Sequence, residues 1–276
     1  DRNFIVVAYR DGDNSNYGTV RAASISGTTL TWGAEYVFAS HSCSNMGIVY
    51  NTSDDVIMVG FAGSGYNTIK VIAATVGAAA NDPSDTDDIA FGSVLDVQTG
   101  SSGNYNASVG YGMLEYNPTY NTATICYQYK VATSDPLTVK AISVSGTTCT
   151  ATSVHDTAGV EIDTTAIELC GQSYDPDIGK TVIVYDNDSV MTAKVLTQSG
   201  TGNRTIAVGT GGAYDANSSA TLTEYYGGML VAYDTDANRH HVVFYDDDAS
   251  AFKLNYFTIA DASATPDWSD EANAGT

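Results

Sequence analysis

The stretch SYDPDIGKTVIVYDND, residues 173–188, has the pattern of a β-hairpin. Tyr174 precedes an acidic segment that closes at Gly179, and a Val/Ile-rich strand follows up to Tyr185, eleven residues after Tyr174. Glycine accepts a positive φ, and Asp side chains bond their own backbone in tight turns. Because such a turn also suits a metal site or a catalytic carboxylate, its meaning depends on whether it recurs.

The hairpin does recur along the chain. Aromatic pairs eleven or twelve residues apart bracket similar segments at Tyr50 and Phe61, Tyr116 and Tyr127, and Tyr233 and Tyr245. The N-terminal FIVVAYRDGD matches only the second half of the hairpin, with Tyr9 in the corresponding place. A second block, such as LTVKAISVSGTTCTAT, follows each hairpin, and its copies end 57 to 60 residues apart, at Trp32, Phe91, Ala151, Val208 and Trp268. The acidic turn is therefore mostly a connection within a repeat.

Each repeat of about 58 residues supplies four short strands with alternating apolar and polar residues. Four strands, repeated about five times, predict an all-β fold and a single β-propeller of about five four-stranded blades; a sandwich or solenoid is the alternative. The blades are expected at about 1–44, 45–103, 104–166, 167–220 and 221–276. The first blade begins at its second strand, so it is expected to be incomplete, and closure of the ring by strand exchange is not assured.

The composition excludes several classes of partner. Of the 276 residues, 43 % are hydrophobic and 16 % charged, and 32 acidic against 11 basic residues give a net charge of −21. Clustered cations, which nucleic acids require, are missing, and an anionic membrane surface is equally disfavoured. No apolar run approaches the roughly 20 residues of a membrane span. Four cysteines lack the CxxC spacing of a zinc site; both disulfides and buried thiols remain open for Cys43, Cys126, Cys149 and Cys170.

The loop after the second strand of a blade is the strongest candidate for a metal site. It reads RDGDNSN at 10–16, DNDS at 186–189 and DDDAS at 246–250. If these loops gather on one rim, their carboxylates suit Ca²⁺: Asp11, Asp13, Asp186, Asp188, Asp246 and Asp248. The pattern of an EF-hand is absent, and solvated turn acids are the alternative interpretation. No other cofactor is expected.

Catalytic chemistry has little support. A glycosidase needs two carboxylates from separate blades, and Glu115, Glu168 and Glu224 lie on or just before first strands. They do not share a repeat position, so no catalytic residue is assigned and no enzyme is predicted. His240 and His241 are adjacent on one strand and face opposite sides, so no histidine cluster is expected.

Two further sets of side chains recur or stand out. The tyrosines at repeat positions are expected to pack between blades with their hydroxyls bonded. Tyrosines outside the pattern are candidates to stack on sugar rings: Tyr66, Tyr105, Tyr111, Tyr120, Tyr225 and Tyr226. The recurring basic residues Arg21, Lys70, Lys140 and Lys194 are expected to pair with acidic turns of their own blade.

The phrases VVAYRDGDNSNYGTV, SISGTTLTWGAEYVF and SYDPDIGKTVIVY resemble repeats of tail-fibre and other virion structural proteins of aquatic bacteriophages. The resemblance implies a non-enzymatic virion surface or fibre protein, in an extracellular or particle-surface location, that assembles with copies of itself or with other virion subunits and contacts host glycans. No functional residue carries over from it. A secreted carbohydrate-active propeller enzyme and a bacterial adhesin or filament subunit are the alternatives.

Overall fold

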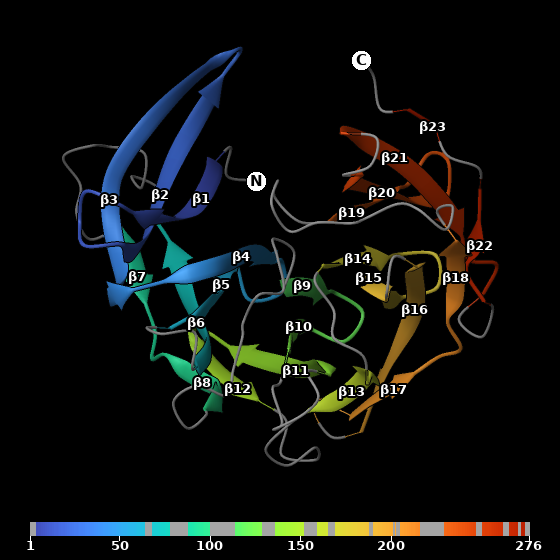
Figure 1. Cartoon of the computed structure of the whole chain (residues 1–276). Coiled ribbons are helices and arrows are strands. Elements are labelled where there is room, and N and C mark those ends of the chain that lie inside the picture. Colours follow the sequence, from blue (N-terminus) through green and yellow to red (C-terminus); the bar gives the residue numbers. More distant parts are fainter. Residues whose placement is uncertain are drawn as a thin grey trace.

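The chain folds into five antiparallel sheets arranged around a common centre (Figure 1). The structure is a computed structural model, and it describes residues 4–63, 68–77, 88–99, 114–128, 136–151, 159–164, 169–187, 190–200, 202, 205–215, 229–246, 250–261, 265–269 and 272–273. The prediction of an all-β propeller with about five blades is confirmed. No helix in the described ranges is long and apolar enough to cross a membrane.

The first three sheets follow the chain in order. The first contains β1 (Phe4–Asp11), β2 (Tyr17–Ser26) and β3 (Thr29–Ser42). The second contains β4 (Ser44–Asn51), β5 (Val56–Ala62), β6 (Thr68–Val76), β7 (Ile89–Phe91) and β8 (Leu95–Thr99). The third contains β9 (Leu114–Asn117), β10 (Thr122–Gln128), β11 (Leu137–Ser145), β12 (Thr148–Ala151) and β13 (Val160–Asp163).

The last two sheets repeat this plan. The fourth contains β14 (Cys170–Asp175), β15 (Lys180–Asn187), β16 (Val190–Ser199), β17 (Thr205–Val208) and β18 (Gly212–Asp215). The fifth contains β19 (Leu230–Asp234), β20 (Arg239–Asp246), β21 (Ala251–Thr258), β22 (Asp267–Trp268) and β23 (Ala272–Asn273). In sheets two to five, the third strand pairs with two short outer strands in succession, as β6 does with β7 and β8. In the first sheet the single long strand β3 covers both outer positions.

The strand register explains the repeat. Each inner-strand tyrosine pairs with a residue of the second strand of its blade. Four positions after that paired residue, the second strand carries a fully buried aromatic side chain; these buried rings are Phe61, Tyr127, Tyr185 and Phe244. The assignment of Tyr245 to this position is therefore wrong. Tyr233 pairs with His240, and Phe244, eleven residues after Tyr233, takes the buried place. Because the face of a strand alternates with each residue, Tyr245 points to the other side.

The acidic turns are structural, as the recurrence predicts. In the opening stretch, Asp175 Oδ1 accepts the backbone N–H groups of Asp177 at 2.9 Å and Ile178 at 3.3 Å. Asn51, Asn117 and Asp234 cap the equivalent turns in the same way. The last turn residue takes a positive φ, and it is a Gly, Asn or Asp in each hairpin: Asp55, Asn121, Gly179 and Asn238.

The core lies between the blades. The second strand of each sheet alternates its side chains between two neighbours: Ile183 and Tyr185 pack into the cluster shared with the third blade, whereas Val182 and Val184 pack against the fifth. The innermost described strands of the five sheets contact each other in succession, from β1 through β4, β9 and β14 to β19. The first and fifth sheets stand at the two ends of this series (Figure 1), and no comparable contact joins them within the described residues.

Candidate functional site

A cavity of about 480 Å³ lies where the inner strands of four blades meet. Its walls come from β4, β9, β14, β19 and the turns that follow them: Val49, Tyr50, Thr52, Glu115, Tyr116, Pro118, Ser173, Tyr174, Pro176, Val231, Ala232, Tyr233 and Thr235. We call this cavity the channel mouth. Among these lining residues, Glu115 is the only carboxylate.

Glu115 has the properties of a group that changes its charge near neutral pH. It projects from β9, and its Oε1 accepts the backbone N–H of Tyr174 in the next blade at 2.9 Å. Burial raises the pKa of the Glu115 carboxyl from 4.5 to about 7, and the hydrogen bond from Tyr174 opposes this shift. The side chain can therefore hold or release a proton at neutral pH.

A pair of catalytic carboxylates is not shown at the channel mouth. Glu168 and Glu224, the other two acids considered for a glycosidase, lie outside the described residues. Glu115 itself is held against the backbone of the neighbouring blade, which accounts for its position without catalysis. Glu115 lies on the inner strand β9, as expected from the sequence, and it lines the cavity.

Tyrosine hydroxyls link the turns of successive blades. The hydroxyl of an inner-strand tyrosine contacts a side chain in the turn of the preceding blade, three residues after that blade's own inner-strand tyrosine. The contacts are Tyr116 Oη with Ser53 Oγ (2.9 Å), Tyr174 Oη with Thr119 Oγ1 (2.7 Å) and Tyr233 Oη with Asp177 Oδ2 (2.9 Å). Tyr116 and Tyr233 also donate to the positive-φ residues of their own turns, Asn121 and Asn238. The predicted packing of repeat tyrosines between blades, with bonded hydroxyls, is confirmed for these three.

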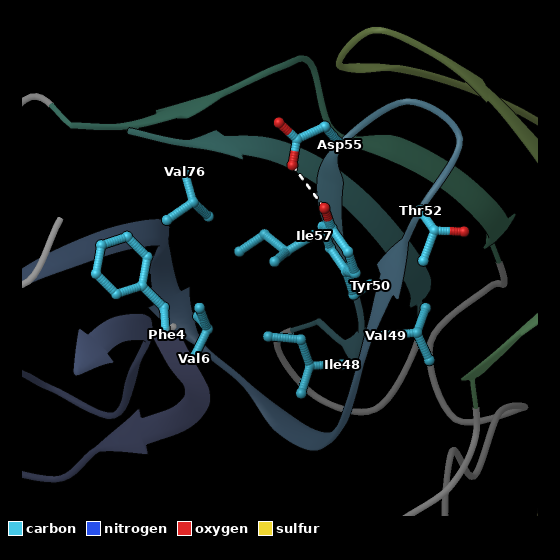
Figure 2. Close-up of a pocket in the computed structure, with 9 residues that line it drawn as sticks. All are labelled: Phe4, Val6, Ile48, Val49, Tyr50, Thr52, Asp55, Ile57 and Val76. Carbon is cyan, nitrogen blue, oxygen red and sulfur yellow. Dashed lines mark hydrogen bonds between the residues drawn. The ribbon is translucent and has the colours of Figure 1, made fainter. Parts of the chain in front are cut away.

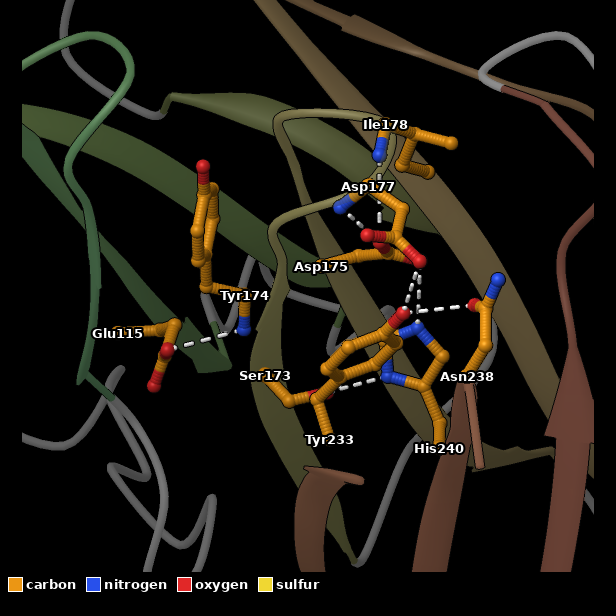
Figure 3. A network of polar contacts seen from close by, with 9 residues as sticks. All are labelled: Glu115, Ser173, Tyr174, Asp175, Asp177, Ile178, Tyr233, Asn238 and His240. Carbon is orange, nitrogen blue, oxygen red and sulfur yellow. Dashed lines mark hydrogen bonds and ion pairs between the residues drawn. The ribbon is translucent and has the colours of Figure 1, made fainter. Parts of the chain in front are cut away.

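A buried Ser–His–Asp arrangement joins the fourth and fifth blades (Figure 3). Ser173 Oγ lies 2.8 Å from His240 Nδ1, and His240 Nε2 lies 3.1 Å from Asp175 Oδ2. His240 also stacks on Phe257, with ring centroids 4.8 Å apart. All three polar residues are buried, and His240 is 0 % exposed. Ser173 borders the channel mouth but is only 4 % exposed, and Asp175 and His240 are buried behind it. A serine nucleophile must reach its substrate, so we interpret this network as a connection between blades.

Sequence reasoning missed this network because its members come from two repeats. The signal was present in part, since an Asn or Asp follows the inner-strand tyrosine in each complete repeat. In the preceding blade interface the same position is filled by Asn117, whose Nδ2 donates to Thr181 Oγ1 at 3.3 Å. Thr181 and His240 occupy equivalent positions in their second strands. Both interfaces are thus joined by a hydrogen bond between equivalent positions, but different side chains form it.

The recurring basic residues follow the prediction only in part. Arg21 donates to the Gly33 carbonyl at 2.6 Å and Lys70 pairs with Asp96, both within one blade. Lys140 and Lys194 instead reach the preceding blade, so their assignment to their own acidic turns is wrong. Lys140 Nζ donates to Val97 O at 2.7 Å and to Gln98 Oε1 at 3.0 Å, and Lys194 Nζ to Ile162 O at 2.8 Å. Their long side chains cross from the third strand of one blade to an outer strand of the preceding blade.

The predicted calcium ligands are partly engaged elsewhere. Asp11 Oδ1 accepts the backbone N–H groups of Asp13 and Asn14 in an exposed turn. Asp186 is buried and accepts the N–H of Leu169 at 2.7 Å. Asp188 and Asp248 lie outside the described residues, and Asp246 is described only as the last residue of β20. Within the described ranges no three His, Cys, Asp or Glu side chains gather as metal ligands.

Of the six tyrosines predicted to stack on sugars, the structure describes one. Tyr120 lies under the Lys180 ammonium, 5.0 Å from its ring centroid, and its hydroxyl accepts a hydrogen bond from the same group. It therefore contributes to the contact between the third and fourth blades. The other five lie outside the described residues: Tyr66, Tyr105, Tyr111, Tyr225 and Tyr226.

Comparison with known proteins shows similarity of fold only. The chain matches no protein-family model and no curated protein sequence. Among solved structures it is similar to TolB from Acinetobacter baumannii (TM-score 0.45, 9 % identity, 96 % of this chain and 52 % of TolB). It is also similar to an engineered GH43 glycoside hydrolase with endo-xylanase and exo-arabinofuranosidase activity (TM-score 0.44, 13 % identity, 97 % of this chain and 50 % of the hydrolase). A third similar structure is the phage phi92 endosialidase (TM-score 0.41, 11 % identity, 97 % of this chain and 45 % of the endosialidase). The chain spans about half the length of these proteins, and its assignment as a propeller rests on its own sheets.

Proposed function

We propose that this propeller is a non-enzymatic module of a surface assembly, a virion surface or tail-fibre structural protein that binds host glycans at the channel mouth. One observation carries the proposal: the polar groups of the inner strands serve to join blades. Ser173 and Asp175 both bond His240 across an interface, and Glu115 accepts a hydrogen bond from the backbone of the next blade. Such a molecule is built as a rigid scaffold.

The channel mouth has the chemistry of a neutral saccharide site. Its volume of about 480 Å³ falls in the range of roughly 300–1,000 Å³ that is common for small-ligand sites. Tyrosine and proline side chains supply apolar walls with polar tips, and Glu115 is its one described ionisable acid. The net charge of −21 disfavours anionic ligands. We therefore propose a neutral sugar as the ligand.

Weak binding at each module is compatible with this role. Sugars that contact one shallow site bind weakly, but many copies in one particle multiply the affinity. The proposal thus includes assembly with further copies of the chain or with other virion subunits, outside the cell. Gold-labelled antibodies against the chain are expected to decorate intact particles. Decoration of bacterial surfaces or filaments would assign it instead to an adhesin or filament subunit.

A glycan array combined with a hydrolysis assay tests the binding role. The chain is expected to bind a set of neutral glycans and to release no reducing ends from them. Ala232→Trp places a large ring in the channel mouth and should abolish binding, because Ala232 is an exposed residue of its wall. Val94→Trp is the matched control, since Val94 is an exposed apolar residue away from the mouth. Equal loss in both variants, or no binding by the unaltered chain, would refute the proposal.

A secreted carbohydrate-active enzyme is the second candidate, because Glu115 combines a raised pKa with a place in the channel mouth. A raised pKa is what a general acid for glycoside cleavage requires. If the chain does hydrolyse a glycan, Glu115→Gln should remove that activity and leave glycan binding intact. Hydrolysis that survives Glu115→Gln would exclude Glu115 as the acid.

A further inference from the structure

Within the part of the chain that the structure describes, the first blade has an unpaired inner edge. In the complete blades the second strand is paired on both sides, as β15 is with β14 and β16. β1 is the second strand of its blade by register, since Val7 lies opposite Arg21 as Ile183 lies opposite Lys194. Within the described residues β1 pairs with β2 alone. An eight-residue apolar strand with an unpaired edge is a template for another strand.

A cavity adjoins this edge (Figure 2). It has a volume of about 540 Å³ and lies between β1 and the second blade. Figure 2 shows Phe4 and Val6 of β1 facing Ile48, Ile57 and Val76 of the second sheet across it. Six of the nine lining residues are apolar, and Tyr50, Thr52 and Asp55 add polar groups.

The complete blades show which side chains belong there. On an inner strand, the residues before and after the tyrosine point to the next blade: Ser173 and Asp175 both reach His240. An inner strand added to the first blade would direct the equivalent residues to Ile48 and Ile57 of the second. An apolar residue before the tyrosine therefore fits this wall, whereas the Ser and Glu found in other blades do not.

The turn after such a strand would cover Tyr50. In later blades the third residue after the inner-strand tyrosine contacts the tyrosine of the next blade, as Ser53 contacts Tyr116. Tyr116 is only 7 % exposed. Tyr50, whose hydroxyl donates to Asp55 of its own turn, is 51 % exposed. This difference is what removal of one inner strand and its turn would leave.

We propose that the β1 edge and the adjoining cavity bind an extended strand of a partner polypeptide, with the sequence pattern apolar–Tyr–Asn/Asp–x–Ser/Thr/Asp. The strand pairs antiparallel with β1 and places its tyrosine opposite Ile5, as Tyr50 lies opposite Ile57. Main-chain hydrogen bonds supply the affinity, and the apolar residue in the cavity supplies the specificity. The first blade then has the same inner strand as the other four.

A labelled synthetic peptide tests the proposal directly. The peptide SNMGIVYNTSD copies residues 44–54, which contain the inner strand of the second blade and fit the pattern. It is expected to bind the full chain with one site, measured by fluorescence anisotropy, and to protect the β1 amides from hydrogen exchange. Two further peptides carry N-methyl groups on the backbone nitrogens of alternate residues, one on the nitrogens that would face β1 and the other on those that would face away. Only the first should lose binding, because strand addition needs the N–H groups that face β1.

Variants of the chain locate the site. Val6→Lys should weaken peptide binding at least about tenfold, because Val6 faces Ile48 and Ile57 across the cavity and an ammonium group is costly to bury against them. Leu30→Lys is the matched control: Leu30 is an exposed apolar residue on the outer strand of the same sheet, and binding should stay unchanged. Circular dichroism of both variants verifies that they fold. The methylated peptides leave the chain unaltered, so the test remains valid if Val6→Lys is unstable.

Three outcomes would overturn the proposal. The first is no saturable binding up to about 1 mM peptide, which corresponds to a free energy of only about −4 kcal/mol. The second is equal binding by the unaltered chain and the folded Val6→Lys variant, or by both methylated peptides. The third is a dimer of the chain, seen by sedimentation, that the peptide dissociates; a second copy would then occupy the edge in place of a separate partner.

Discussion

The Sγ atoms of Cys126 and Cys170 lie 2.8 Å apart, one on β10 of the third blade and the other on β14 of the fourth. Both side chains are buried and both are free thiols. A small movement brings the two sulfurs to the bonding distance of about 2.05 Å. The sequence left disulfides and buried thiols open, and the structure brings the thiols of this pair into contact.

Oxidation is expected to link Cys126 to Cys170. With glutathione disulfide as oxidant, the two thiols lose two protons and two electrons, and two molecules of glutathione form. The reaction should be slow, because burial raises the pKa of Cys170 and only the thiolate attacks. The bridge closes a loop of 44 residues and should stabilise the fold by up to about 4 kcal/mol.

Peptide mapping by mass spectrometry and chemical denaturation measure these two effects. Cys170→Ala serves as the control and should gain no stability from the oxidant. A link between Cys43 and Cys149 in its place, or a stable mixed disulfide at Cys126, would contradict the assignment.

Tyr185→Ala should destabilise the fold by about 3 kcal/mol or more, as large aromatic truncations in cores do. Tyr185 is fully buried, and its hydroxyl donates to Asp163 Oδ2 of the preceding blade at 3.0 Å. Tyr185→Phe keeps the ring and should cost only about 1 kcal/mol, the usual net value of one hydrogen bond. Urea denaturation measures both. A similar cost for the two variants would show that the hydroxyl, and not the packed ring, dominates.

The His240–Asp175 contact should show strong energetic coupling. His240→Thr leaves a buried carboxylate with a poorer partner, and we expect a loss of about 3 kcal/mol. The added change Asp175→Asn recreates the Asn–Thr pair found at Asn117 and Thr181, and it should recover part of that loss. A double-mutant cycle by urea denaturation measures the coupling. Strictly additive effects would mean that the two side chains do not act as a pair.

Glu115 should make the fold less stable as the pH rises from about 4.5 to 7. The carboxyl pKa is about 7 in the folded chain and 4.5 ordinarily, so the unfolded chain ionises first and is favoured as protons are removed. The resulting loss in the free energy of unfolding is absent below pH 4.5 and reaches up to about 3 kcal/mol above pH 7. Glu115→Gln should remove this slope and keep the acceptor for the Tyr174 N–H. An unchanged pH profile in the variant would refute the assignment.

Calcium is expected to have little effect on stability. Asp11 and Asp186 are engaged with backbone N–H groups, so they offer few free oxygens to a cation. Calcium or a chelator should therefore shift the melting temperature by less than about 1 °C, because only a cation that binds the folded state well above its dissociation constant stabilises the fold appreciably. Asp188→Asn should be nearly neutral for stability. A large fall with the chelator would restore the acidic loops as a metal site, and Asp188→Asn would then identify the loop.

The sequence determined what short-range chemistry can determine. The turn that follows Asp175 is set by a side chain that bonds its own backbone and by a positive φ at Gly179, and both act within a few residues. Repetition of this turn and of the alternating strands was enough to predict about five blades and an incomplete first blade.

Only the tertiary structure decided how the blades meet. The contacts between Cys126 and Cys170, Ser173 and His240, and Lys140 and Val97 join residues 43 to 67 positions apart. The repeat is too irregular to fix their partners, because equivalent positions carry different side chains, such as Thr181 in one blade and His240 in the next. Which pair forms depends on packing geometry, and burial then sets the charge of groups such as Glu115.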